Sequence, residues 1–364
     1  MEKIKTTVIG AGIVGLSIAE KLSQNFDELL VVEKEESFGR HASSRNSEVI
    51  HSGLYYPKGS LRAKLCVRGN KLLYNFLKKH DIPHRNCGKL IVATTEEEKS
   101  ILNELYKNGM RNNVEDIRII SEEEAKGLEP EIHSHGALHV PSTGIMDSHS
   151  VMKKLEFLTE KNGTMISYAT EVSDIKKVKD GYILSFKNDD FKIKTEILIN
   201  SAGLWSDDIA EMAGIDIAAN NYELHYCKGD YYKTTRYRNF QHLVYPVPTN
   251  ISLGIHIRIN LNGEVSFGPN AYYVDELDYK IDETYKQDFY ESINTYLTIG
   301  KEDLHLDDCG IRPKLQAKDE PVKDFVIKNE KNLGLPNFIN LVGIDSPGLT
   351  ACPAIAEYVE ELIE

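Results

Sequence analysis

The stretch Gly10-Ala11-Gly12-Ile13-Val14-Gly15 decides the fold that this sequence predicts. It follows an apolar run at residues 4–9, which has the length of a buried strand, and it leads into an apolar helical pattern at residues 16–23. In such a unit Gly10 permits the tight turn, Gly12 lets the backbone approach a pyrophosphate, and Gly15 lets the helix pack closely on the strand. Because the helix N-terminus also offers free N–H groups to phosphate, the stretch predicts a dinucleotide-binding βαβ unit.

An acidic residue and a hydroxyl-rich segment follow this unit and indicate which nucleotide it binds. Glu33 ends the next predicted strand, residues 29–33, where a carboxylate accepts hydrogen bonds from ribose hydroxyls and repels a 2′-phosphate. A second strand, which ends in Ala202-Gly203, resembles an FAD-contacting motif of flavoproteins. The segment after Glu33 resembles the flavoprotein extension that runs towards the isoalloxazine ring, and it contains Lys34, Arg40, Ser43, Ser44, Arg45, Asn46 and Ser47. Together these features favour FAD over NAD.

The composition limits the class of protein. The chain has 364 residues, with 43 basic and 56 acidic side chains and a net charge of −13, which is typical of a soluble acidic protein of two or three domains. The acidic balance argues against a nucleic-acid partner. Five scattered cysteines argue against a disulfide framework or a zinc site, and the histidines lack acids at metal-ligand spacing, so we expect no metal. We also expect no transmembrane segment, because the longest uncharged stretch, residues 239–257, contains two prolines.

Hydrophobic periodicity outlines the rest of the chain. We expect a helix at residues 61–77, a strand at 89–93, a β-meander at 164–200 and a tyrosine-rich antiparallel sheet at 222–273. A buried strand at residues 338–344 and a terminal helix from about Pro353 complete the pattern. We therefore predict an α/β fold with two interleaved parts. The first is a doubly wound, Rossmann-like FAD-binding domain of residues 1–84, 145–215 and 305–364, and the second is an α+β substrate domain of residues 85–144 and 216–304, built on the antiparallel sheet.

Motifs spread along most of the chain resemble one enzyme superfamily. They are Ser44-Arg45-Asn46-Ser47, the run VIHSGLYY at residues 49–56, Tyr245-Pro246-Val247-Pro248, Gly268-Pro269-Asn270-Ala271 and Ser346-Pro347-Gly348-Leu349-Thr350. The sequence resembles the D-amino-acid oxidase and glycerol-3-phosphate dehydrogenase superfamily of FAD enzymes, and within it the L-2-hydroxyglutarate dehydrogenases and oxidases. It departs from that branch at Lys228-Gly229-Asp230, where Arg-Gly-Glu is usual, and at Glu48, where glycine is common. These departures bear on the substrate rather than on the cofactor.

The resemblance implies a non-covalently bound FAD and further contacts to it. Residues 346–350 precede the predicted terminal helix, so their N–H groups and the positive end of the helix dipole would face the flavin O2 atom. Taken alone, the same residues read as a plain turn and helix cap. Asp345 would hold a ribityl hydroxyl. Besides the residues already named, the contacts implied are Val172, Gly310, Arg312, Asp345, Pro347, Gly348, Leu349 and Thr350.

Oxidation of a 2-hydroxy acid needs a base that is neutral near physiological pH, and histidine fits that need. The resemblance places His51 beside the flavin ring and His256 on the substrate sheet. We favour His51 as the base and His256 as the residue that binds or orients the substrate. Exchanged roles, or two histidines that merely satisfy hydrogen bonds in the core, are the alternatives.

A carboxylate substrate needs a fixed cation, and the planar fork of arginine suits it. Arg312, which follows Gly310, is the first candidate, and it is expected to take part in catalysis with the two histidines. Arg258 and Lys228 are candidates for a second carboxylate, although each would also fit an ordinary structural ion pair. Tyr245 and Asn270 are candidate hydrogen-bond donors to the substrate, with packing as the alternative for Tyr245.

The leading hypothesis is FAD-dependent oxidation of L-2-hydroxyglutarate to 2-oxoglutarate, a small anionic substrate. Glycerol-3-phosphate oxidation or amino-acid oxidation by an enzyme of the same superfamily is the alternative within enzymes. A non-catalytic flavin-binding sensor is the alternative from another class. The sequence does not distinguish oxygen, a quinone or a protein as electron acceptor. We expect a cytoplasmic protein, with peripheral association at the inner face of a membrane left open.

Overall fold

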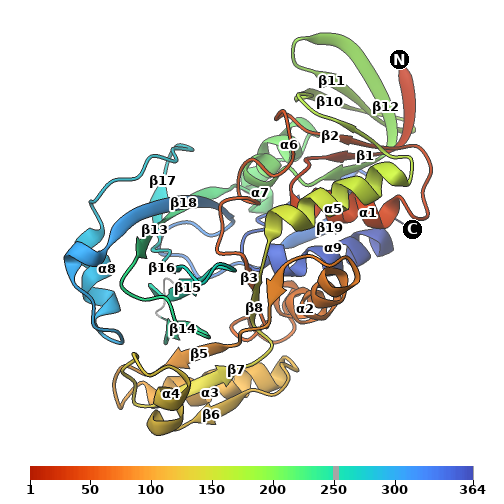
Figure 1. Ribbon diagram of the computed structural model, residues 1–364. Coiled ribbons are helices and arrows are strands. Elements are labelled where there is room, and N and C mark those ends of the chain that lie inside the picture. The colour runs from red at the N-terminus through yellow and green to blue at the C-terminus, as the bar shows by residue number, and fades with distance from the viewer. Residues whose placement is uncertain (249–253, 364) are drawn as a thin grey trace.

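The computed structural model describes residues 1–248 and 254–363. The described strands form an eight-stranded sheet, a nine-stranded sheet and a small three-stranded sheet between them, and the chain passes between the two large sheets several times (Figure 1). The three-stranded sheet comprises β3 (Val49–Ile50), β4 (His84–Arg85) and β8 (Gly144–Met146). In the described part of the chain, no helix has the length and apolar character that crossing a membrane requires.

The eight-stranded sheet has a parallel centre. β1 pairs in parallel with β2 and β12, β2 pairs with β9, and β12 pairs with β20. Residues 172–200 of the predicted meander form the antiparallel set β10, β11 and β12, whereas β9, at the start of the predicted range, pairs in parallel with β2. The strands are β1 (Glu2–Ile9), β2 (Leu29–Val32), β9 (Met165–Ser167), β10 (Val172–Val178), β11 (Gly181–Phe186), β12 (Asp189–Asn200), β19 (Val326–Asn329) and β20 (Phe338–Val342).

Both faces of the parallel strands are covered, as a doubly wound sheet requires. Side chains alternate along a strand, so Val8 packs into the cluster that holds the apolar faces of α1 and α9, while its neighbour Ile9 packs against α6 on the opposite face. Figure 1 shows α1, α5 and α9 side by side on one face of the sheet. The helices of this part of the molecule are α1 (Ile13–Leu22), α2 (Leu61–Lys79), α5 (Ser148–Lys161), α6 (Ser206–Met212) and α9 (Gly348–Leu362).

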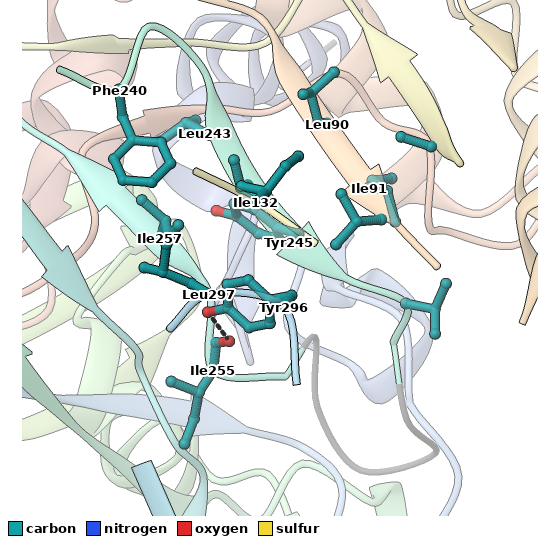
Figure 2. Packing of buried hydrophobic residues seen from close by; sticks show 14 of the residues in the cluster. Leu90, Ile91, Ile132, Phe240, Leu243, Tyr245, Ile255, Ile257, Tyr296 and Leu297 are labelled. Atoms are coloured by element: carbon teal, nitrogen blue, oxygen red, sulfur yellow. Dashed lines mark hydrogen bonds between the residues drawn. The ribbon is translucent and has the colours of Figure 1, made fainter. Parts of the chain in front are cut away.

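The nine-stranded sheet carries the second apolar core. It is antiparallel, as the turn residues predict, except that β14 pairs in parallel with β5. Figure 2 shows this core around Tyr245 and Tyr296, and the Tyr296 hydroxyl donates to the carbonyl of Ile255 at 2.8 Å. The strands are β5 (Lys89–Val92), β6 (Arg118–Ile120), β7 (Ala137–Val140), β13 (His225–Thr234), β14 (Leu243–Pro246), β15 (Ile257–Ile259), β16 (Val265–Phe267), β17 (Tyr272–Val274) and β18 (His305–Lys314).

Two features of the fold differ from the sequence-based expectation. β18 pairs with β13, so residues 305–314 belong to the second sheet, although the predicted division gives them to the cofactor domain; the other boundaries of that division stay a prediction. The terminal helix begins at Gly348 rather than near Pro353, and Pro353 lies inside it. Its first turn therefore includes the motif that we expected to precede the helix. The remaining helices are α3 (Lys99–Arg111), α4 (Glu122–Leu128), α7 (Ile217–Asn220) and α8 (Lys286–Ile293), with 3-10 turns at Gly203–Trp205, Lys301–Asp303 and Glu330–Leu333.

The turn between β1 and α1 requires glycine for two physical reasons. Gly10 has a φ of +100°, a region that side chains disfavour, and a Cβ there would lie 2.7 Å from the carbonyl oxygen of Ser201. At Gly15 a Cβ would lie 1.9 Å from the carbonyl oxygen of Gly10. The helix can thus approach the strand only because both positions lack a side chain.

Replacing Gly15 by alanine is expected to push α1 away from β1 and to lower the free energy of unfolding by about 3 kcal/mol. Gly127→Ala is the matched control, because Gly127 is an exposed residue of α4 whose added Cβ would meet nothing within 4 Å. That variant should gain about 0.5 kcal/mol. Chemical unfolding measures both changes, and equal stability of the two variants would contradict the close-packing account.

Candidate active site

The first of two adjoining cavities lies where the strands of the parallel sheet end, the place where α/β sheets bind ligands. The predicted residues that line it are Gly10, Gly12, Glu33, Lys34, Arg40, Ser43, Val172, Ala202 and Gly203. They come from β1, β2, β10 and the segments after β2 and β12, which lie far apart in the sequence. The fold thus brings together most of the residues predicted for the adenosine and pyrophosphate part of a dinucleotide.

Local hydrogen bonds shape this cavity. The Glu33 carboxylate accepts from the backbone N–H of Ala11 at 2.7 Å and of Glu35 at 2.9 Å, which ties the end of β2 to the glycine turn. Ser43 Oγ accepts from the N–H of Ile13 at 3.0 Å, so the predicted extension closes over the N-terminus of α1. A carboxylate at the cavity wall beside a side-chain-free turn fits the ribose and pyrophosphate of FAD.

The second cavity is joined to the first, because Val14, Ala42, Ser43 and Ile344 line both. It lies between the first residues of α9 and the second sheet. The predicted residues that line it are Arg45, Asn46, Ser47, His51, Tyr245, His256, Gly310, Arg312, Asp345, Pro347, Gly348 and Leu349. Because α9 begins at Gly348, its unpaired N–H groups and the positive end of its dipole belong to this cavity.

Asp345 stands at the entrance of α9 between two cations. Its carboxylate lies 2.5 Å from the Arg62 guanidinium and 3.5 Å from Lys314 Nζ, and its side chain is buried. Arg62 also donates to the carbonyl of Ser346. The chain before α9 is therefore fixed by a buried ion pair, and Asp345 is shared between that structural contact and the cavity wall.

Six predicted residues line neither cavity, yet several of them hold residues that do. Gly15 packs on Gly10, and Ser44 Oγ donates to the carbonyl of Gly39. Thr350 Oγ1 accepts from the N–H of His51 at 2.9 Å. The carbonyl of Asn270 accepts from Arg312 at 2.8 Å.

The two cations proposed for a second carboxylate are also outside the cavities. Arg258 pairs with Asp307 at 3.2 Å and donates to the carbonyl of Asn46, so it joins the second sheet to the extension after β2. Lys228 is buried and donates to the carbonyl of Lys280. For Arg258 the structure shows the ion pair that the sequence left as the alternative, whereas the contact of Lys228 is a hydrogen bond to a backbone carbonyl.

The two histidines meet at the second cavity with different surroundings. His256 Nδ1 lies 2.9 Å from the carbonyl of Gly254, so this nitrogen carries the proton of the neutral ring and Nε2 is an acceptor. His51 Nε2 lies 3.4 Å from Ser346 Oγ, beside the start of α9. Among the described residues, His256 Nε2 and His51 Nδ1 are buried without a hydrogen-bond partner. Each ring therefore has one nitrogen with unused hydrogen-bonding capacity.

Burial keeps both imidazoles neutral. Desolvation, reinforced by the charge of Lys89, lowers the pKa of His51 to about 3, and the pKa of His256 likewise to about 3. A neutral ring at physiological pH can accept a proton, whereas an imidazolium cannot. Both rings are therefore in the form that can accept a proton.

Arg312 projects from β18 and is held by three backbone carbonyls. Its Nε donates to Cys227, and its Nη2 donates to Lys228 and Asn270, at distances between 2.8 and 3.4 Å. None of these acceptors is a carboxylate, and within residues 1–248 and 254–363 the guanidinium, which lines the cavity, forms no ion pair with an acid. An anionic group of a substrate is the natural partner for it.

Sequence reasoning missed several residues of this region. Tyr231 lines the second cavity and its hydroxyl lies 2.8 Å from Ser47 Oγ, and Trp205 lines the first, with Lys34 Nζ 2.9 Å from its ring centroid. Lys89 is buried behind the second cavity. A lysine that opens the apolar run KLIVA was a signal available in the sequence, since charged residues are rarely buried without a reason.

The fold and the paired cavities are those of an FAD-dependent oxidoreductase. The model of the FAD dependent oxidoreductase family matches residues 5–362, and the chain belongs to that family. The DAO-type fold and FAD as cofactor, both expected from the sequence, are thereby confirmed.

Individual proteins of known name are similar to this chain in sequence or in structure. The chain is 36% identical to the mitochondrial L-2-hydroxyglutarate dehydrogenase of Arabidopsis thaliana, over 98% of this chain and 83% of the relative. It is 28% identical to the glycerol 3-phosphate dehydrogenase of Caloramator mitchellensis, over 98% and 73%. Among solved structures, the dithionite-reduced L-alpha-glycerophosphate oxidase of Mycoplasma pneumoniae with FAD bound has a TM-score of 0.88 at 28% identity, covering 100% of this chain and 95% of that one.

The low pKa of the two histidines predicts how the reductive half-reaction depends on pH. If either ring is the base, the rate is lost only when that ring is protonated, so it should stay constant from about pH 7 down to about pH 5. Stopped-flow measurement of flavin reduction by any substrate of the enzyme tests this. An inflection near pH 6.5, the value of an exposed histidine, would show that these rings are not held neutral by burial.

Proposed function

We propose that the protein oxidises L-2-hydroxyglutarate to 2-oxoglutarate with FAD. The observation that carries the proposal is the meeting of Arg312 and two neutral histidines at one cavity, directly beside the N-terminus of α9. The relative from Arabidopsis thaliana, named as an L-2-hydroxyglutarate dehydrogenase, supports this choice among 2-hydroxy acids.

Each group at the second cavity has a distinct role in the proposed oxidation. FAD, when bound, would supply the acceptor for the hydride that leaves the carbon carrying the hydroxyl group. Arg312 binds the carboxylate next to that carbon and thereby fixes its orientation. A histidine accepts the hydroxyl proton, and the free N–H groups of α9 favour negative charge at the end of the cavity nearest Gly348. Tyr245 and the second histidine form the wall opposite.

We favour His51 as the base and His256 as the residue that orients the substrate. His51 Nε2 is on the more open side of the site beside Ser346, and Thr350 fixes the His51 backbone. His256 is more deeply buried, and the carbonyl of Gly254 holds its ring in one orientation, which suits a residue that positions the substrate. The alternative is His256 as the base and His51 as the orienting residue, and substitutions at the two positions distinguish these assignments.

Oxidation of glycerol 3-phosphate is the second candidate function. It is favoured by the similarity of the whole chain to the two glycerol-phosphate enzymes named above. A phosphate would use the same positive charge of Arg312.

The acceptor of the electrons and the place of the protein in the cell are also proposals. We propose non-covalent FAD, with oxygen, a quinone or a protein as acceptor. A cytoplasmic location, with contact to the inner face of a membrane left open, is our expectation from the sequence, whereas the Arabidopsis thaliana relative is named as mitochondrial.

Anaerobic mixing with candidate substrates tests the proposed function. L-2-hydroxyglutarate should bleach the flavin absorbance within seconds, and D-2-hydroxyglutarate, its matched control, should not, because Arg312 and the base fix one face of the carbon. Bleaching by glycerol 3-phosphate with no response to L-2-hydroxyglutarate would replace the proposed function by the second candidate.

Single substitutions separate the roles of the histidines. His51→Ala should slow flavin reduction by about 10²-fold or more, because the hydroxyl proton loses its acceptor. His256→Ala should raise the substrate concentration needed for half-maximal rate more than it lowers the maximal rate. His305→Ala, a change at an exposed histidine of β18, should leave both unchanged. A larger loss of maximal rate in His256→Ala than in His51→Ala would exchange the two roles.

A further inference from the structure

Lys89 occupies a position where a charged side chain is costly. It is the first residue of β5, which pairs with β14 on one side and β7 on the other, and only 1% of its surface is exposed. Leu90 and Ile91, which follow it, belong to the apolar core of the second sheet, as does Tyr245 on β14 (Figure 2). An apolar residue would fit this place without the loss of hydration that an ammonium group suffers.

The ammonium group is held by aromatic rings and not by an acid. Its Nζ lies 4.5 Å from the ring centroid of Tyr55 and 4.7 Å from that of Tyr245. Within residues 1–248 and 254–363, it forms no ion pair with an aspartate or glutamate. Desolvation therefore lowers the pKa of Lys89 to about 7, so its charge changes within the physiological range.

Tyr245 connects this lysine to the active site. The ring of Tyr245 lies on the ring of His256, with centroids 3.7 Å apart and planes inclined by 15°. Tyr245 and His256 both line the second cavity, whereas Lys89 lies behind them. The Tyr245 ring thus contacts both Lys89 Nζ and the His256 ring, and the cation is close enough to lower the pKa of both His51 and His256.

We propose that Lys89 is a positioning residue for the oxidation: from its place against the Tyr55 and Tyr245 rings, it holds the Tyr245 ring on His256 and presents a positive charge to the two histidines. The inference rests on the proposed function in that one of these histidines takes the substrate proton. Removal of the cation would make an imidazolium easier to form, so the base would be lost at a higher pH than in the unaltered protein.

Other groups that face these rings do not substitute for Lys89. Arg258 and Arg312 also lower the pKa of His256, but neither acts on His51. No carboxylate is among the groups that shift either histidine. The groups facing Lys89 and the two histidines are Tyr55 from the loop after β3, Cys66 from α2, Tyr245 from β14, Arg258 from β15 and Arg312 from β18.

The test compares Lys89→Met, which keeps the length but removes the charge, with Lys89→Arg, which keeps a charge at every pH. Lys192→Met is the matched control at an exposed lysine of β12. Flavin reduction is measured between about pH 3 and pH 9, so that the range includes the protonation of both histidines, with whichever substrate bleaches the unaltered enzyme. The titration of the ¹³C-labelled histidines is followed by NMR in each protein without FAD or substrate, with His51→Ala and His256→Ala to assign the signals.

Lys89→Met should lose half of its maximal rate of flavin reduction at a pH about one unit higher than the unaltered protein, near pH 4 instead of pH 3, and above about pH 6 the pH dependence of the two proteins should be the same. The pKa of His51 and His256 should rise by about one unit, and Tm should rise because a buried amine is removed. Lys89→Arg should keep the low histidine pKa values, and Lys192→Met should match the unaltered protein in all measurements.

A merely structural lysine would give a different result. Lys89→Met would then lower Tm and slow the reaction by the same factor at every pH, with unchanged histidine titrations, and this outcome would overturn the inference. Should Lys89→Met fail to fold, Lys89→Gln, which also removes the charge and keeps a long unbranched side chain, gives the same comparison with Lys89→Arg. Because the NMR titration uses no substrate, failure of the proposed substrate and failure of this inference are separate results.

Discussion

The close approach of α1 to β1 is the constraint on which the rest of the structure depends. Gly15 lies against the carbonyl of Gly10, and Gly10 lies against that of Ser201, so neither position has room for a side chain. It sets the N-terminus of α1 at the end of the parallel sheet, where Ser43 then closes the extension over it. Both cavities are built on this corner, since Val14 and Ser43 line each of them.

The second cavity, at the other end of the site, is formed by a helix N-terminus and the second sheet. The N-terminus of α9 is brought there by the buried pair of Asp345 with Arg62, and the second sheet supplies Arg312 and His256 opposite. Positive character thus comes from a helix end and one arginine, within a chain whose net charge is −13. The overall acidity therefore says little about the ligand, because local groups decide what the cavity binds.

Much of the fold was predictable because its signals are local. The glycine turn, the meander and the helix at α2 each follow from patterns within about 20 residues. The parallel pairing of β14 with β5 and the pairing of β18 with β13 join segments that are far apart, so no local pattern announces them. For the same reason the site was predicted only in part. His51 and Arg312 do reach the cavity, but Arg258 and Lys228 are taken up by Asp307 and by the carbonyl of Lys280, contacts that arise only on folding.

In the proposed reaction, the hydrogen on carbon 2 of L-2-hydroxyglutarate leaves as a hydride while a neutral histidine takes the hydroxyl proton. The most direct test is the rate of anaerobic flavin reduction by L-2-hydroxyglutarate that carries deuterium at carbon 2, compared with the unlabelled compound. The account predicts slower reduction by the deuterated substrate. Equal rates, or no reduction by either compound, would contradict it.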